Sequence, residues 1–154
     1  MGYHDTLVSD FRDSRFQQAF KQYFSELQLQ VKDWDGLFAE MDGEGGNQAF
    51  VRAAAGGPVI GFIQFKPIAF TSWFFEGACG FIREFWVAEE YRGMGHGSAL
   101  LGLAEKHFLE SGLYTAILTA DTAGGFYEAR GYRKALGCKA KNKMDVFVKQ
   151  LGGG

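Results

Sequence analysis

The chain has 154 residues, of which 47% are hydrophobic and 22% charged, and its 16 basic and 18 acidic side chains leave a net charge of −2. This length suits one domain, residues 1–154, with its own core. The balanced charge, without a long basic run, argues against nucleic-acid binding, which requires concentrated positive charge. No segment is long enough to cross a membrane and the N-terminus lacks the form of a signal peptide, so we expect a cytoplasmic protein.

Hydrophobic periodicity and turn residues divide the chain into alternating strands and helices. In chain order the pattern predicts a strand (3–8), two helices (14–27 and 33–41), a hairpin (49–55 and 59–65), a strand (81–87), a helix (97–111), a strand (113–120), a short helix ending at 130 and two strands (132–136 and 144–149). This order predicts an α/β fold with a single mixed sheet and helices on its faces.

Several local signals set the expected boundaries in the first half of the chain. Ser14 and Gln17 fit a capping box at the start of the first long helix. An acidic, glycine-rich loop at 42–47 is expected to end the second helix. Pro67 is expected to end the hairpin, since proline cannot donate to a strand ladder. Residues 68–78 are then an aromatic connector.

Boundaries in the second half rest on glycines and on short polar residues. Gly112 is the expected stop of the 97–111 helix, and Gly131 closes the short helix. Asp121 or Thr122 is expected to cap that short helix. Cys79 and Cys138 lack the spacing of a metal site or a redox pair, so we expect free thiols and no metal site.

A strand, a glycine-rich turn and a helix follow one another from Phe81 to Leu101. The turn reads Arg92-Gly93-Met94-Gly95-His96-Gly97. Glycines allow a tight turn that brings backbone N–H groups against an anion, and the N-terminus of the following helix adds unsatisfied donors and the positive end of its dipole. The segment therefore predicts a phosphate site.

Three kinds of phosphate site have glycine-rich signatures that this turn could match. A dinucleotide fingerprint is a poor match, because Ser98 stands at the last glycine position and fewer than sixty residues follow. A Walker loop is excluded, because Gly-Lys-Ser/Thr is missing. The turn does match Arg/Gln-x-x-Gly-x-Gly/Ala, the signature of the GNAT superfamily of acetyl-coenzyme A-dependent N-acetyltransferases.

A second motif carries the same resemblance. Residues 126–132, Phe-Tyr-Glu-Ala-Arg-Gly-Tyr, resemble the family's Phe-Tyr-x-x-x-Gly-Phe and lie at the family's spacing from the turn. Ser72-Trp73 ahead of Gly80–Val87 is similar to the small-amine, or polyamine-type, members. The resemblance covers most of the chain and implies the GNAT fold, in which the single mixed sheet is mostly antiparallel.

The resemblance also implies where acetyl-coenzyme A binds. Backbone N–H groups of the turn and of the first helical residues would hold the pyrophosphate, and the strand residues before the turn would pair with the pantetheine arm. Phe126 and Tyr127 would contact the same molecule from the second motif. The cofactor-binding residues implied are Phe85, Trp86, Val87, Arg92, Gly93, Met94, Gly95, His96, Gly97, Ser98, Phe126 and Tyr127.

Acetyl transfer to an amine needs a neutral nucleophile, a stabilised oxyanion and a proton for the departing thiolate. By resemblance, Tyr127 is the proton donor, as a phenol near the thiol in acidity. Glu84 is the candidate general base, while Arg83 replaces the first of the two acidic residues that related enzymes often carry there. Ordered water or another carboxylate remains an alternative to Glu84.

Other residues have a structural and a functional interpretation. A solvent-facing side chain is expected for His96 and a packing role for His107. The acidic residues of 33–44 could attract a cationic amine, although a solvated surface is the preferred interpretation. The aromatic side chains Trp34, Trp73, Phe74 and Phe75 could form a pocket, a core or a dimer interface.

The sequence thus predicts an N-acetyltransferase that moves the acetyl group of acetyl-coenzyme A to a primary amine in a ternary complex. Its partner would be a small-molecule amine or a peptide acceptor, and a homodimer is left open. A coenzyme A-binding module without catalysis is the alternative, because the assignment of the base rests on Glu84 alone.

Overall fold

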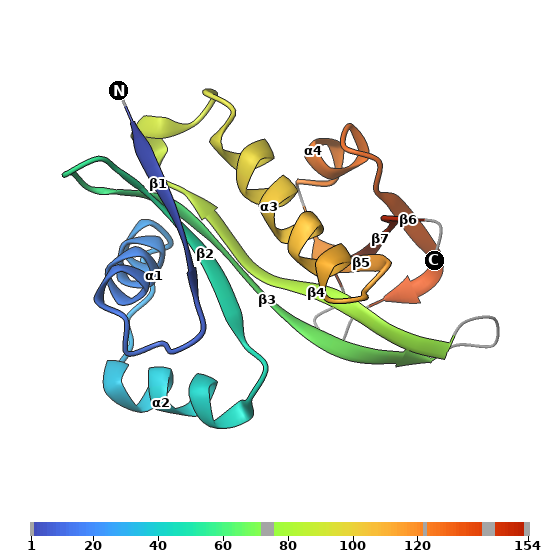
Figure 1. Ribbon diagram of the computed structural model, residues 1–154, viewed down its shortest axis with the longest axis horizontal. Coiled ribbons are helices and arrows are strands. Elements are labelled where there is room, and N and C mark those ends of the chain that lie inside the picture. Colours follow the sequence, from blue (N-terminus) through green and yellow to red (C-terminus); the bar gives the residue numbers. More distant parts are fainter. Residues whose placement is uncertain (1, 72–75, 122, 140–143, 153–154) are drawn as a thin grey trace. The chain divides into compact units, whose positions relative to one another are not determined.

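The computed structural model describes residues 2–71, 76–121, 123–139 and 144–152 (Figure 1). The elements follow the predicted order. They are β1 (Tyr3–Val8), α1 (Ser14–Glu26), α2 (Trp34–Glu44), β2 (Gln48–Ala54), β3 (Val59–Thr71), β4 (Glu76–Val87), the 3₁₀ turn η1 (Glu89–Tyr91), α3 (His96–Glu110), β5 (Thr115–Ala120), α4 (Gly124–Glu128), β6 (Arg133–Lys139) and β7 (Asp145–Gln150).

The seven strands form one mixed sheet in the order β1-β2-β3-β4-β5-β7-β6. The pairs β1–β2, β2–β3, β5–β7 and β6–β7 are antiparallel. The pair β4–β5 is parallel, with Gly80 opposite Ala116, because α3 carries the chain back between these strands. The expected mixed, mostly antiparallel sheet with flanking helices is confirmed.

The chain forms two compact units. The first consists of Met1–Phe65 and Glu84–Ala104, and the second of Lys66–Arg83 and Glu105–Gly154. The first unit therefore contains the end of β4, the glycine turn and the start of α3. The second contains β5, α4, β6 and β7.

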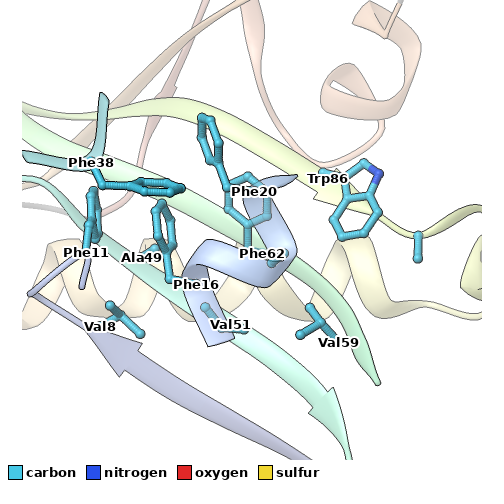
Figure 2. Packing of buried hydrophobic residues seen from close by; sticks show 12 residues of the cluster. Val8, Phe11, Phe16, Phe20, Phe38, Ala49, Val51, Val59, Phe62 and Trp86 are labelled. Atoms are coloured by element: carbon cyan, nitrogen blue, oxygen red, sulfur yellow. The ribbon is translucent and has the colours of Figure 1, made fainter. Parts of the chain in front are cut away.

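Aromatic side chains fill the core of the first unit (Figure 2). Phe16 and Phe20 of α1, one turn apart, pack on Phe62 of β3, with ring centroids 5.7 Å away in both cases. Phe38 of α2 lies 5.9 Å from each of the two α1 rings. Because all four rings are at most 2% exposed, each contributes about 1.5–3 kcal/mol through burial.

Gly61 on β3 shows how α3 and the end of β4 are positioned. A Cβ there would lie 2.4 Å from the Trp86 carbonyl oxygen and 3.3 Å from Leu100 Cδ1. Only glycine fits without displacing backbone. Since Phe62, the next residue, points to the opposite face, α1 and α3 lie on opposite faces of β3.

In one buried cluster of the second unit, the free thiol of Cys79 packs with Ile117 and Val146. Gly80 is the close-packing residue here, since a Cβ would approach the Phe108 ring to 2.4 Å. This contact places the second half of α3 directly on β4. Gly112 adopts φ = 79° after α3, which confirms it as the stop of this helix.

Two predicted helix boundaries in the first half were wrong. Asp13, not Ser14, caps α1, because its Oδ1 accepts from the N–H groups of Arg15 and Phe16 at 2.9 and 3.2 Å. Helix α2 continues through the acidic residues to Glu44. Asp42 is held there because its Oδ1 accepts from the N–H of Phe11 at 2.9 Å.

Strand β3 was predicted too short. It passes through Pro67 to Thr71, and β4 begins at Glu76, so residues 68–71 and 76–78 are strand rather than connector. The pairing of β3 with β2 stops at Phe65, so a residue without an N–H is tolerated two positions later. The aromatic residues Trp73, Phe74 and Phe75 lie outside the described residues.

The short helix α4 also begins differently from the prediction. Its N-cap is Ala123, which makes no side-chain capping bond, so the expected cap by Asp121 is wrong. Thr122 lies outside the described residues. The helix ends at Glu128, and Gly131 follows with φ = 94°, as a closing glycine should.

Candidate functional site

The glycine turn between β4 and α3 has the backbone geometry of an anion site. Gly93 and Gly95 adopt φ = 79° and 86°, and a Cβ at either would contact nothing within 4 Å. The left-handed backbone, rather than lack of space, therefore favours glycine. The Gly95 carbonyl accepts from the N–H of Ala99 at 3.1 Å and starts α3. The N–H groups of the first helical turn, including those of Gly97 and Ser98, point out of the helix end.

The Arg92 side chain is 52% exposed but folds back on the strand before the turn. Its Nε donates to the Val87 carbonyl oxygen at 2.9 Å, and its Nη2 donates to Glu26 Oε1. Residues 92–95 of the turn are all exposed, and Met94 is 65% exposed. The turn therefore offers its backbone, while its guanidinium group is engaged within the first unit.

Glu26 is not among the residues predicted from the sequence, and it connects three parts of this region. Its carboxylate accepts from Trp86 Nε1 at 3.0 Å and from the Glu89 N–H at 3.2 Å, in addition to Arg92. Burial opposes ionisation of Glu26, but these donors outweigh burial and lower the pKa of the carboxyl. Glu26 is therefore ionised and ties α1 to the end of β4.

Only a weak local signal in the sequence marks Glu26. It is the last residue of α1, and no basic residue lies in that turn. A carboxylate is unfavourable at the negative end of a helix dipole. Gln28 follows with φ = 60°, which is uncommon for a residue with a side chain. Two locally unfavourable features at one helix end suggest that this helix end is part of a functional site.

A pocket of about 380 Å³ lies between the end of α1 and the end of β4. Its lining residues are Tyr23, Glu26, Leu27, Phe85, Trp86, Val87 and Arg92. Four of the residues that the sequence predicted for acetyl-coenzyme A thus lie around one pocket. The remaining wall comes from α1, whose contribution the sequence did not reveal.

The candidate base Glu84 lies one residue before the pocket-lining strand segment. It is half-buried, while Arg83 is exposed, because neighbouring residues of a strand point to opposite faces. Tyr23, which lines the pocket, donates its hydroxyl to Glu84 Oε1 at 2.8 Å. The structure thus brings Glu84 next to a pocket residue.

The acidic residues of α2 mostly have structural partners. Asp33 caps α2 by accepting from the Gly36 N–H at 3.0 Å. Glu44 Oε1 accepts from Asn47 Nδ2 at 2.7 Å. Trp34 stacks on Phe38 with centroids 5.7 Å apart, so Trp34 packs against the core. None of these side chains lines the pocket of about 380 Å³.

The expectation that His96 faces solvent is wrong. It is the first residue of α3 and only 8% exposed. Its ring lies against Tyr3 and Tyr91, and its Nδ1 is 3.1 Å from Nη1 of the buried Arg52. Sequence reasoning missed this because Arg52 is 44 residues earlier in the chain. His107 is half-buried on α3, as expected for a packing residue.

The second unit carries the other predicted motif. Tyr127 of α4 is 9% exposed and packs on Tyr132 and Phe147, with centroid distances of 5.8 and 6.4 Å. Burial raises the pKa of Tyr127 from 10.0 to about 12. The phenol therefore keeps its proton at neutral pH but is a weaker acid than the sequence argument assumed. Phe126 lies under the Arg130 guanidinium, at 3.7 Å.

No group of three or more His, Cys, Asp or Glu side chains in residues 2–71, 76–121, 123–139 and 144–152 could hold a metal ion. Within the same ranges, no helix is long and apolar enough to cross a membrane.

Comparison with known proteins finds similarity to acetyltransferases. Residues 8–132 match the model of the acetyltransferase (GNAT) family. No curated protein matches the sequence. The fold is similar to that of a putative N-acetyltransferase from Lactobacillus plantarum, with 20% identity, a TM-score of 0.71 and coverage of 99% of this chain and 100% of the other.

Two further similar structures contain ligands. PaiA N-acetyltransferase from Thermoplasma acidophilum, in complex with coenzyme A, is 14% identical with a TM-score of 0.63, over 97% of this chain and 99% of the other. Arabidopsis thaliana NAA60, in complex with a bisubstrate analogue, is 16% identical with a TM-score of 0.69, over 98% and 100%. At these identities the likeness concerns the fold.

Proposed function

Because the chain belongs to the GNAT acetyltransferase family, and is thus an N-acetyltransferase that uses acetyl-coenzyme A, we propose where it binds this cosubstrate and how it transfers the acetyl group. The proposal treats residues 1–154 as one acetyltransferase domain. The acceptor is a primary amine of a small molecule or peptide, and transfer occurs by direct attack in a ternary complex.

The glycine turn suits the pyrophosphate of acetyl-coenzyme A. Left-handed Gly93 and Gly95 expose the backbone, and the start of α3 adds N–H donors and a positive dipole end. Residues 92–98 would hold the two phosphates through these N–H groups. The Arg92 side chain, held by Val87 and Glu26, would position the turn rather than bind the phosphates directly.

The pocket beside the turn is the observation that supports the proposal most strongly. It joins Phe85, Trp86 and Val87 to Arg92 and to the end of α1. The strand segment would pair with the pantetheine arm, which leaves the α1 side of the pocket for the acceptor. Since that side includes Tyr23, the acceptor amine would lie near the hydroxyl that holds Glu84.

The bound thioester supplies an activated acetyl group. The amine forms a C–N bond with the acetyl carbon, and the C–S bond breaks. Glu84 takes the proton lost from the amine, directly or through water. Tyr127, which stays protonated at neutral pH because burial raises its pKa to about 12, donates a proton to the departing sulfur. Phe126 contacts the cosubstrate beside it.

Release of coenzyme A thiol in the presence of amines tests this proposal. The panel contains polyamines, amino acids, aminoglycosides and short peptides with free N-termini, each with acetyl-coenzyme A. We expect sustained thiol release with one class and background release with the others. Failure of all four classes would contradict the acceptor assignment.

A non-catalytic coenzyme A-binding module is the second candidate. The observation in its favour is that the Glu84 carboxylate already accepts a 2.8 Å hydrogen bond from Tyr23, which competes with proton abstraction. Calorimetric binding of acetyl-coenzyme A without turnover on any amine would support this candidate. Absence of binding at high micromolar ligand would contradict both.

A further inference from the structure

Arg52 of β2 is a buried arginine whose positive charge is balanced by an ion pair within the first unit. Its side chain is 7% exposed and forms a bidentate ion pair with Asp5 of β1, through Nε–Oδ1 at 2.7 Å and Nη2–Oδ2 at 2.9 Å. The Tyr3 ring lies 4.2 Å from the guanidinium carbon. Burying a guanidinium group is costly unless it is paired in this way, so the group has a fixed position.

The remaining guanidinium nitrogen, Nη1, lies next to His96. Arg52 Nη1 and His96 Nδ1 are 3.1 Å apart. A guanidinium group only donates hydrogen bonds, so Nδ1 must be the acceptor. The His96 ring therefore carries its proton on Nε2 and is neutral. A proton on Nδ1 would remove the acceptor, and protonation of both ring nitrogens would also place a second cation beside Arg52.

Within the described part of the chain, the His96 ring contacts Tyr3, Tyr91 and Arg52. Tyr3 and Tyr91 meet the ring nearly at right angles, at 84° and 83°, with centroids 5.2 and 6.1 Å away. Both carboxylate oxygens of Asp5 accept from Arg52. Arg52 is thus the residue that orients the ring.

His96 lies at the junction between the glycine turn and α3. It is the first residue of α3 and follows Gly95, whose left-handed backbone turns the chain into the helix. Fixing the ring fixes the start of α3 relative to β1 and β2. We propose that Asp5 and Arg52 orient His96 as the neutral Nε2–H tautomer, and that His96 is a positioning residue for the coenzyme-binding turn.

This inference rests on the proposed role of the turn in binding acetyl-coenzyme A, but its first test does not. Nitrogen-15 NMR of the imidazole rings distinguishes the two neutral tautomers and the cation. The chain has three histidines, and His96→Asn assigns the His96 signals by their loss. At neutral pH we expect the Nε2–H form, whether or not ligand is bound. An Nδ1–H form or an imidazolium would overturn the proposal.

Calorimetric affinity for coenzyme A is the second test. His96→Leu removes the acceptor and should weaken binding about tenfold, the effect of losing one hydrogen bond to a charged group. His96→Asn places an amide oxygen near the Nδ1 position and should recover most of the affinity. His107→Leu, the same change farther along α3, should leave affinity at the wild-type value.

Arg52→Lys tests whether Arg52 acts by orienting His96 or only by placing a positive charge in the interior. Lysine keeps the positive charge but lacks the planar fork that reaches Asp5 and His96 together. We expect weaker coenzyme A binding and a changed His96 ring signal in the same variant. Equal affinity for wild type, His96→Leu and Arg52→Lys would refute the positioning role, whereas failure of wild type to bind would refute the proposed function instead. Thermal unfolding of each variant confirms that it is folded at the assay temperature.

Discussion

The hydroxyl of Tyr23 on α1 donates a 2.8 Å hydrogen bond to Glu84 Oε1 on β4. Together with the bond from Trp86 to Glu26, it fastens α1 to the strand segment that lines the pocket. The two bonds have opposite directions, since α1 is donor in one and acceptor in the other. The pocket geometry therefore depends on polar pairs between side chains about 60 residues apart.

Glu84→Gln tests the assignment of the base. Glutamine keeps an oxygen that can accept from Tyr23 but cannot take a proton from the amine. We expect kcat to fall about 100-fold or more, with coenzyme A affinity near wild type. Glu40→Gln, the same change at an exposed position on α2, serves as the control. Wild-type turnover in Glu84→Gln would assign the base elsewhere.

Tyr127→Phe tests the proton donor. The ring remains to fill the buried site, but the proton is lost, so kcat should fall about 100-fold or more. Coenzyme A affinity should change little. Tyr114→Phe removes a hydroxyl from a residue that is 43% exposed and should behave as wild type. If the two variants turn over equally, Tyr127 is a packing residue.

Alkaline unfolding reports on the same phenol. The folded-state pKa of Tyr127 is about 12 and its unfolded reference is 10.0. The contribution of the phenol to the unfolding free energy is therefore complete below pH 10. About 3 kcal/mol of it is lost as the pH rises from 10 to 12. Tyr127→Phe should show a smaller loss of unfolding free energy over this range. Identical pH profiles would mean that the phenol is not buried in solution.

Gly95→Ala tests the backbone of the turn. At φ = 86° an alanine costs about 1–2 kcal/mol, so the turn should change conformation and coenzyme A binding should weaken. Gly102→Ala lies inside α3, exposed and with nothing within 4 Å of the added Cβ. That control should gain about 1 kcal/mol of stability and bind normally. Weakening in both variants to the same extent would remove the specific role of the turn.

Glu26→Ala tests the connection between α1 and the turn. Trp86, Arg92 and the Glu89 N–H lose their common acceptor, so the unfolding free energy should fall by about 1–3 kcal/mol. Because the pKa of Glu26 is lowered in the folded state, its contribution is present above the unfolded pKa and disappears on acidification. The difference between wild type and variant should therefore shrink at low pH. A constant difference across pH would show that Glu26 acts through packing alone.

Local patterns predicted the order of the elements and the parts of the site that lie within one segment. The turn from Arg92 to Gly97 was identifiable because its glycines serve a local conformation. Glu26 and Arg52 were not, since their partners are distant in sequence. Pro67 misled the prediction of β3, because a strand residue that lacks a partner on one side can be proline.

Hydrogen–deuterium exchange with and without coenzyme A tests the central claim most directly, because it reads the backbone N–H groups themselves. We expect saturation with coenzyme A to slow exchange in peptides that contain residues 92–98, with little change in α2 (Trp34–Glu44). Slowed exchange elsewhere in the chain, with no change in residues 92–98, would contradict the assignment of the glycine turn as the pyrophosphate site.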